Sequence, residues 1–305
     1  MALPIDEFQK RLESISEVDG VQFARLATLR DAENAHEQAV SKFWGHRTLS
    51  DAFKCFYLET VELGNTAVAP KVTIPLSANY PRFVPRIAVA FQGLCGAECA
   101  AQLGYPYQGY GHLRNIFDEL VLTSAALQKL TDFDKIDGID PSEQFDPSLV
   151  KKIKRKRMDN EFEVRQQMTG KKSGLKPESV EELAMWDALF DWETHGARLS
   201  AAQAMAYMKG TEPLPIVPKF KEGSYALFMN RFSEIGWMLH RLLPALQPPD
   251  VLMPDAWHGK WQILDESFEQ MVYSLTAQSK KKIGEVMVEF VKAKFPFHAK
   301  SAFPL

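Results

Sequence analysis

Apolar residues recur at steps of three and four positions along most of this chain, and that spacing constrains its fold more than any other feature. Such spacing gathers the apolar side chains on one face of an α-helix. No run alternates convincingly between apolar and polar residues, as a half-buried strand does, and no segment is repeated. The sequence therefore predicts an all-α protein, a multi-helix bundle of about seven to nine helices with a basic insert. The expected helices span residues 21–47, 53–63, 87–103, 112–130, 178–209, 225–246 and 257–294.

Stretches rich in proline, in glycine or in one sign of charge separate these helices. Four prolines make residues 69–86 a broken connection, and residues 104–111 (GYPYQGYG) are typical of a turn between two packed helices. Residues 132–147 are acidic and rich in turn-forming residues. We expect an N-terminal helical half over 1–131, a mobile acidic-to-basic insert or linker over 132–177, and a C-terminal helical half over 178–305 packed on the first.

The overall composition excludes several classes of protein. Lys and Arg number 36 against 39 Asp and Glu, and this net charge of −3 excludes a basic nucleic-acid coat. No run approaches the roughly 18 apolar residues that a membrane span needs, and the first ten residues lack the features of a secretory signal. Three cysteines, an odd number in a long chain, favour a reducing compartment. The expected location is the cytoplasm, with no membrane partner.

The charge is unevenly distributed. Residues 151–176 contain ten basic and three acidic side chains. The densest part is a run without an acidic residue, comprising Lys151, Lys152, Lys154, Arg155, Lys156 and Arg157. This run could contact the phosphates of RNA or DNA, although it has no interleaved aromatic residue to stack on bases. A solvated charged helix is the alternative interpretation.

The helix expected over 112–130 carries polar residues beside a continuous apolar face. Leu113, Ile116, Phe117, Leu120, Ser124 and Leu127 share that face, which predicts a core position. Arg114 and Asp118 are four residues apart and can pair, while His112, Asn115 and Glu119 form a separate polar stripe. Helix capping with an ordinary surface ion pair is one interpretation. A pocket lined by Arg114 and Glu119 is the other.

A second polar cluster is expected near the end of the helix that begins at residue 178. Glu193 shares the apolar face of Trp186 and Phe190, where an unpaired carboxylate would be costly to bury. Arg114 is a candidate partner for it, or Glu193 lines a cavity. A second stripe comprises Asp187, Asp191, His195 and Arg198, and it is typical of a solvated face. Arg114, Glu119, Glu193 and His195 are therefore the candidate catalytic residues.

Other chemical signatures point to no cofactor and no metal. Glu33 and His36 form one Glu-x-x-His, but a di-iron bundle needs a second copy. Cys95 and Cys99, one helical turn apart, could supply two metal ligands, yet the small residues around them favour buried free thiols. The chain also lacks phosphate-binding glycine loops, nucleophile elbows and dinucleotide fingerprints.

Two of these segments resemble known sequences. The segment from Gly104 to Phe133 resembles one that recurs in bacterial helical proteins of unknown function, and ETHGARLS, from Glu193 to Ser200, is similar to their second polar patch. Some of those families are linked to the HEPN group of helical RNases and nucleotide-binding modules of defence and toxin systems. In HEPN nucleases an Arg is followed four to six residues later by a His, and a polar residue comes directly after the Arg. Here Arg114 and Asn115 are followed by Asp118, Glu119 and Leu120, so the group that would transfer protons is missing.

Two functional classes follow. The resemblance implies a HEPN-like cytoplasmic protein that binds RNA or a nucleotide in a bacterial defence or stress system, with an altered nuclease site. The alternative is a non-enzymatic protein–protein interaction module, for which a homodimer is one expected form.

Overall fold

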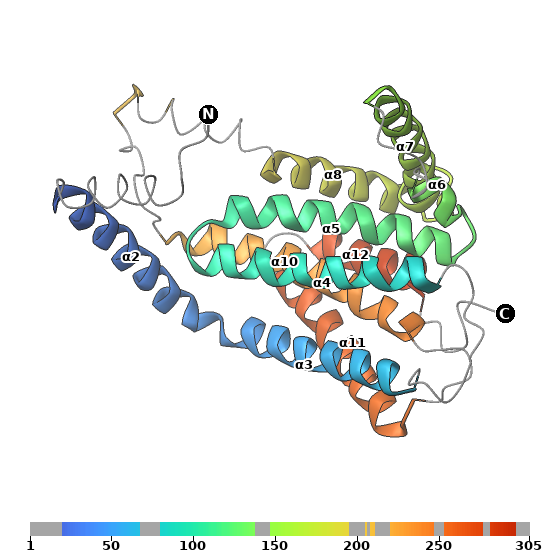
Figure 1. Cartoon of the computed structure of the whole chain (residues 1–305), viewed down its shortest axis with the longest axis horizontal. Coiled ribbons are helices and arrows are strands. Elements are labelled where there is room, and N and C mark those ends of the chain that lie inside the picture. The colour runs from blue at the N-terminus through green and yellow to red at the C-terminus, as the bar shows by residue number, and fades with distance from the viewer. Residues whose placement is uncertain are drawn as a thin grey trace, which may run out of the picture.

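The computed structural model describes residues 20–67, 80–137, 147–194, 205, 208–210, 220–246, 253–276 and 281–296, and they form a helical bundle (Figure 1). These residues contain ten α-helices and no β-strand. The α-helices are α2 (Gly20–Val40), α3 (Trp44–Ala67), α4 (Tyr80–Gln102), α5 (Pro106–Leu127), α6 (Phe133–Asp137), α7 (Pro147–Met168), α8 (Pro177–Thr194), α10 (Glu222–Leu242), α11 (Asp255–Thr276) and α12 (Lys281–Lys294). Short 3-10 helices, η1 (Ser41–Phe43) and η2 (Leu243–Leu246), follow α2 and α10. The all-α prediction is confirmed, with slightly more helices than expected.

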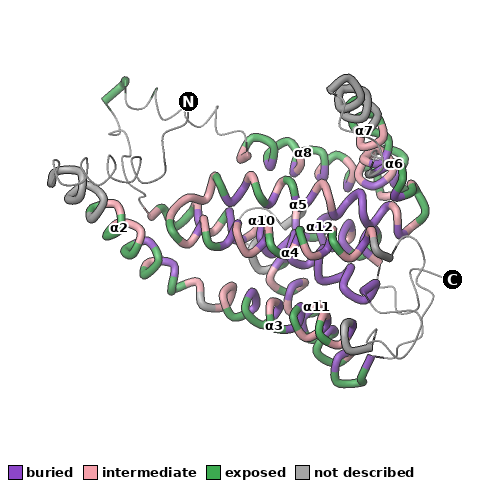
Figure 2. Tube along the Cα trace, in the orientation of Figure 1, coloured by how far each residue is buried: buried purple, intermediate pink, exposed green. Residues whose placement is uncertain are grey.

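The central helix is α5, which packs against α4, α8, α10 and the C-terminal part of α7. All six residues of its predicted apolar face are buried, and Val121, Leu122, Thr123 and Ala125 on the other sides are buried too. Buried residues, drawn in purple, follow one another along α5 and α10 in the middle of the bundle (Figure 2). In α10, every residue from Arg231 to Leu242 is buried, including the polar side chains of Arg231, Glu234 and His240. Helices α5 and α10 therefore position the polar groups of the interior.

Close packing of α4 on α5 depends on a glycine. A Cβ atom added at Gly109 would lie 2.6 Å from Cε2 of Phe228 and 2.9 Å from the carbonyl oxygen of Ala97. Only glycine leaves room for the two helices and the Phe228 ring at this point. Gly104, with a φ of 94°, makes the turn that joins α4 to α5.

Several helix boundaries differ from the sequence prediction. The break expected between residues 47 and 53 lies instead at η1 (Ser41–Phe43), so the segment expected over 53–63 is part of α3. Helix α4 begins at Tyr80 and contains Pro85, because its buried face already starts at Phe83 and continues through Ile87. Helix α5 begins at Pro106, so only a short part of 104–111 is a turn. The single helix expected over 257–294 is two helices, α11 and α12, which lie side by side and bring Lys292 to Glu269, with 2.6 Å between Nζ and Oε1.

The segment 132–177 contains two helices that contact the bundle. Phe133 and Ile136 of α6 are buried, as are Val164 and Met168 near the end of α7. Figure 1 shows α7 leaving the bundle beside α6, at the same edge as α8. In the described part of the chain, no helix is long and apolar enough to cross a membrane.

Candidate functional site

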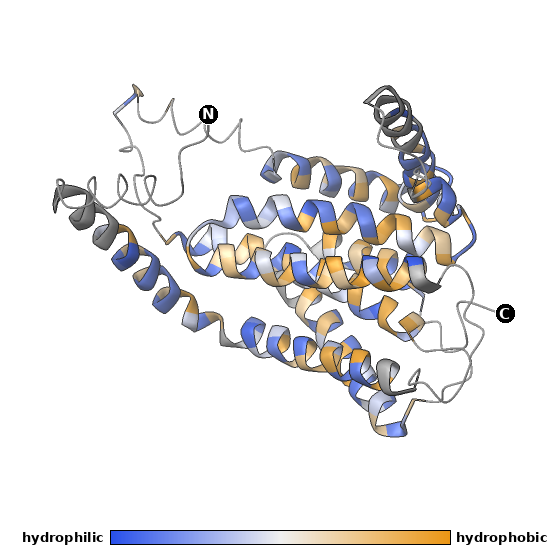
Figure 3. Cartoon of the chain, viewed as in Figure 1, coloured by the Kyte–Doolittle hydropathy of each residue, from blue (hydrophilic) through white to orange (hydrophobic). Residues whose placement is uncertain are grey.

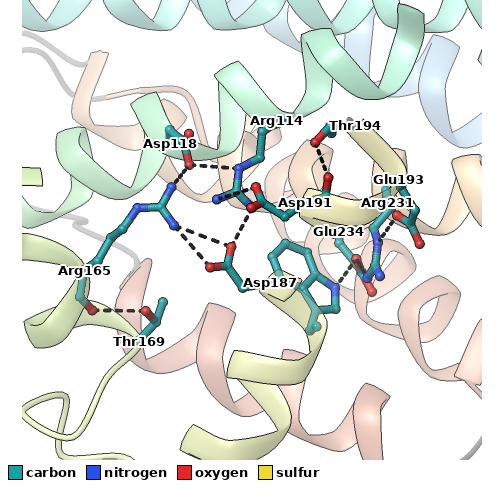
Figure 4. A network of polar contacts seen from close by, with 11 residues as sticks. Arg114, Asp118, Arg165, Thr169, Asp187, Asp191, Glu193, Thr194, Arg231 and Glu234 are labelled. Atoms are coloured by element: carbon teal, nitrogen blue, oxygen red, sulfur yellow. Dashed lines mark hydrogen bonds and ion pairs between the residues drawn. The ribbon is translucent and has the colours of Figure 1, made fainter. Parts of the chain in front are cut away.

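Arg114 of α5 holds a network of carboxylates that come from α5 and α8 (Figure 4). Its Nη1 donates to Oδ1 of Asp187 at 2.5 Å, and its Nη2 lies 3.6 Å from Oδ1 of Asp191. Its Nε is also 3.5 Å from Asp118 on the next turn of α5, as the spacing of four residues predicts. Asp187 and Asp191, expected on a solvated face, are partly exposed but paired with Arg114. The sequence could not show this pairing because the partners are more than 70 residues apart.

Arg165 of α7 joins the same network. Its guanidinium contacts Asp118, and its Nη1 lies 3.3 Å from Oδ2 of Asp187. Burial raises the pKa of Asp118, and the nearby Arg165 and Arg114 oppose that rise. The two arginines and three aspartates therefore connect α5, α7 and α8 through charge-assisted hydrogen bonds.

Glu193 belongs to a second and deeper cluster. Its Oε2 accepts from Nε of Arg231 at 3.1 Å, and Arg231 also donates to Oε2 of Glu234 at 3.2 Å. Trp186 Nε1 donates to Glu234 at 2.9 Å, and the Arg231 guanidinium carbon lies 4.7 Å from the centroid of the Trp186 ring. The predicted pairing of Glu193 with Arg114 is therefore wrong. The need for a cationic partner was inferred correctly, but the partner is an arginine in the part of α10 that is buried on all sides.

The charged groups of this cluster shift one another's pKa values. Burial lowers the pKa of Arg231, but Glu234 and Glu193 outweigh that effect and the pKa is raised overall. Burial raises the pKa of Glu234 despite the opposing effects of Arg231 and Trp186. The buried hydroxyl of Tyr110 has no hydrogen-bond partner, and burial followed by the charge of Glu193 raises its pKa.

Glu119 lies in neither cluster. It pairs with Arg86 of α4, and both side chains are largely buried. The three candidate catalytic residues that the structure describes, Arg114, Glu119 and Glu193, thus lie in three separate ion-pair clusters. His195, the fourth candidate, lies outside the described residues.

A solvent-open groove of about 790 Å³ lies beside Glu119, between α4 and α5 with one wall from α7. Its lining residues are Arg82, Pro85, Arg86, Val89, Ala90, Gly93, His112, Asn115, Ile116, Asp118, Glu119 and Glu161. The polar stripe predicted on α5, comprising His112, Asn115 and Glu119, faces this groove. The sequence predicted a pocket lined by Arg114 and Glu119. Glu119 lines the observed groove, but Arg114 does not.

The groove combines apolar and polar surface. Val89 is 64% exposed, and with Ala90, Gly93 and Ile116 it gives the groove an apolar part. His112 and Asn115 are exposed. Arg82 pairs with Asp134, and 38% and 78% of these two side chains are exposed. An ion pair this exposed contributes little to stability, so a bound anion can replace Asp134 at small cost.

Sequence reasoning missed the α4 side of this groove. Arg82, Arg86, Val89 and Gly93 recur at helical spacing, which would have placed them on one face of a helix. Because Pro81 and Pro85 lie in this segment, the sequence predicted an irregular connection up to residue 86 and not a helix. In the structure Pro81 lies in the first turn, where an intrahelical donor is not needed.

The remaining candidates have structural partners. Glu33 accepts a hydrogen bond from the Tyr105 hydroxyl at 2.6 Å, and His36 Nδ1 lies 2.9 Å from the carbonyl oxygen of Gln102. Cys95 is half-buried, but Cys99 is exposed, so the prediction that both thiols are buried is wrong. Among the described residues, no group of three or more His, Cys, Asp or Glu side chains is placed to hold a metal ion.

The basic run predicted from residue 151 to 157 lies within α7, and Arg155 is exposed. The side chains of Lys151, Lys152, Lys154, Lys156 and Arg157 lie outside the described residues. Positions 154 and 157 precede Glu161 by seven and four residues, so all three positions share one face of α7. The face of α7 that reaches the groove thus continues into the basic run.

Comparisons with protein-family models, with curated proteins and with solved structures find no match to this chain.

Proposed function

We propose that the groove between α4, α5 and α7 binds a nucleoside phosphate, either free or at the end of an RNA strand. The observation that carries this proposal is the combination, in one groove, of exposed apolar surface, an amide, an imidazole and a partly exposed arginine that pairs with Asp134. Its volume of about 790 Å³ lies within the range of small-molecule sites, roughly 300 to 1,000 Å³.

The base and the phosphate of a nucleotide each have a suitable partner in the groove. The apolar surface around Val89 suits one face of a base, because burying that surface is favourable and every base has a flat face. The Asn115 amide offers both donors and an acceptor for a base edge. Arg82 provides planar donors that match phosphate geometry.

The basic run extends the same site. Positions 154 and 157 lie on the face of α7 that carries Glu161, so Lys154 and Arg157 are the residues expected to contact phosphates beyond the first nucleotide. This assignment favours binding over cleavage, because Asp118 and Glu119 occupy the positions of the nuclease histidine and are held by Arg165 and Arg86.

The proposal agrees with the resemblance to HEPN-type helical proteins of bacterial defence or stress systems. A cytoplasmic location is part of it, supported by three cysteines that are all free thiols.

The test is equilibrium binding by fluorescence anisotropy with the full chain. The probes are labelled AMP, a short RNA with a 5′-phosphate and the same RNA without that phosphate. Asn115→Ala and Arg82→Ala should each weaken binding about tenfold, which corresponds to one lost hydrogen bond of roughly 1.4 kcal/mol. Gln262→Ala and Lys260→Ala, on the exposed side of α11, are the matched controls and should leave affinity unchanged.

The probes also separate the two sources of the ligand. Equal affinity for AMP and phosphorylated RNA assigns the groove to a free nucleotide, and much tighter RNA binding assigns it to a strand end. Absence of binding to all three probes, or unchanged affinity in both groove variants, contradicts the proposal.

A further inference from the structure

Helix α8 has apolar residues on two opposite faces. Leu183, Trp186 and Phe190 are buried against the bundle. Met185, Leu189 and Trp192, at spacings of four and three residues, are 43%, 45% and 52% exposed. Orange residues alternate with blue ones in the middle of α8, and the ends of the helix are blue (Figure 3). An exposed apolar stripe bordered by polar residues is typical of an interaction site, so the outer face of α8 has the character of a contact surface.

Helix α7 has a comparable surface. Val164 and Met168 attach its C-terminal end to the bundle, whereas Met158 and Phe162, four residues apart, are 59% and 66% exposed. Helix α7 extends away from the bundle at the edge where α8 lies (Figure 1). The described part of each chain thus exposes one short apolar stripe on α7 and another on α8.

The two helices carry opposite charges. Residues 177–194 of α8 contain six acidic residues and no basic one, whereas residues 147–157 of α7 contain six basic residues and no acidic one. Three of the acidic residues of α8 are paired with arginines of the same chain, but Glu178 and Glu181 are exposed on the face of the apolar stripe. Two copies of α8 facing each other would bring like charges together, which disfavours an α8 to α8 contact. The surface that complements α8 in both charge and apolar character is α7.

We propose that two copies of this chain form a closed dimer in which α7 of each copy packs on the exposed face of α8 of the other. A reciprocal contact of this kind covers both pairs of stripes at once and leaves none exposed to recruit a third copy. The apolar contact does not involve the ligand groove, because Met158 and Phe162 do not line the groove and lie on another face of α7 than Glu161.

The order of residues also fixes the direction of the helices. On the exposed face of α8, Glu178 and Glu181 precede the apolar stripe, and all of these residues are exposed. On α7, exposed Arg155 precedes Met158 and Phe162 on the same face. Parallel packing therefore places Arg155 opposite the glutamates and the apolar residues opposite one another, whereas antiparallel packing would place charges against apolar residues.

Sedimentation velocity over a range of concentrations tests the dimer. The wild-type chain should sediment as a dimer, and Phe162→Ser and Leu189→Ser should each weaken dimerisation by about tenfold or more. Ile263→Ser is the matched control, because Ile263 is also 66% exposed but lies on α11. It should leave the dimer intact. Circular dichroism checks that each variant remains folded.

A charge exchange tests the register. Arg155→Glu and Glu181→Arg should each weaken the dimer, and the combination should restore most of the loss, since it re-creates an opposite-charge pair in both halves of the contact. A wild-type chain that stays monomeric, equal loss in Ile263→Ser, or additive loss in the double variant would each overturn the proposal.

Discussion

Arg231 of α10 donates through Nε to Oε2 of Glu193 on α8, with 3.1 Å between the atoms and both side chains largely buried. The same guanidinium reaches Glu234, so two carboxylates share one cation inside the bundle. This triad explains how Glu193 can lie on the apolar face of α8. It also connects the end of α8 to the buried part of α10.

Replacing Arg231 by methionine should destabilise the protein by about 3 to 5 kcal/mol, because Glu193 and Glu234 would remain buried without their cation. Combining it with Glu234→Gln should cost less than the sum of the two single changes, since the glutamine removes a buried charge and still accepts from Trp186. Urea unfolding monitored by tryptophan fluorescence measures these free energies. Additive effects would mean that the two residues are energetically independent.

A pair of glycines in α5 offers a test of helix packing. Gly109→Ala should destabilise the protein by about 1 to 3 kcal/mol, because its Cβ would meet Phe228 and the carbonyl oxygen of Ala97. Gly111, two residues later in the same helix, has no atom within 4 Å of an added Cβ. Gly111→Ala should therefore stabilise the helix, by up to about 1 kcal/mol. Thermal unfolding of both variants checks the opposite signs, and equal effects would contradict this packing.

His240 should make stability depend on pH. It is fully buried, its Nε2 lies 3.0 Å from the carbonyl oxygen of Trp261, and burial lowers its pKa to about 3. Between about pH 6.5 and this lowered pKa, the unfolded chain binds a proton that the folded chain does not, so stability falls as the pH falls, by up to about 1.4 kcal/mol per pH unit. The contribution is fully present above about pH 6.5.

The variant His240→Phe should have a shallower pH dependence than wild type in this window, as measured by urea unfolding at pH 5 and pH 7. His112→Gln, which changes an exposed histidine, is the control. Identical pH dependence in wild type and His240→Phe would show that His240 does not titrate in this way.

Salt should reveal which part of α7 contacts phosphates. Changing Lys154 and Arg157 together to alanine should reduce the slope of log affinity for single-stranded RNA against log salt by about 1.4, roughly 0.7 for each lost phosphate contact. Lys260→Ala should not change this slope. If the double variant keeps the wild-type slope, the basic run serves solubility and not binding.

The sequence predicted local features well and distant partners poorly. The core face of α5 could be read from residue spacing because a helix brings residues three and four apart together. The partners of Arg114 and Glu193 lie 73 and 38 residues away in Asp187 and Arg231, and no local pattern contains that information. Arg231 was especially difficult to identify, because the second half of its helix is buried on all sides and the sequence alone does not distinguish a buried arginine from one on a solvated face.

The groove was missed for a different reason. Its α5 wall was expected as a polar stripe, but its α4 wall contains prolines that ordinarily break a helix. Burial of Phe83 and Ile87 against the core outweighs the local cost of Pro85. Tertiary packing, which single-residue preferences do not include, therefore decides whether residues 80–86 form part of the site.

Photo-crosslinking with 8-azidoadenosine monophosphate tests the proposed site most directly. After irradiation of the full chain and proteolysis, mass spectrometry should find the adduct on peptides that contain residues 82–93 or 112–119, and excess AMP should suppress it. Adducts confined to other parts of the chain, or adducts that excess AMP does not reduce, would contradict nucleotide binding in the groove.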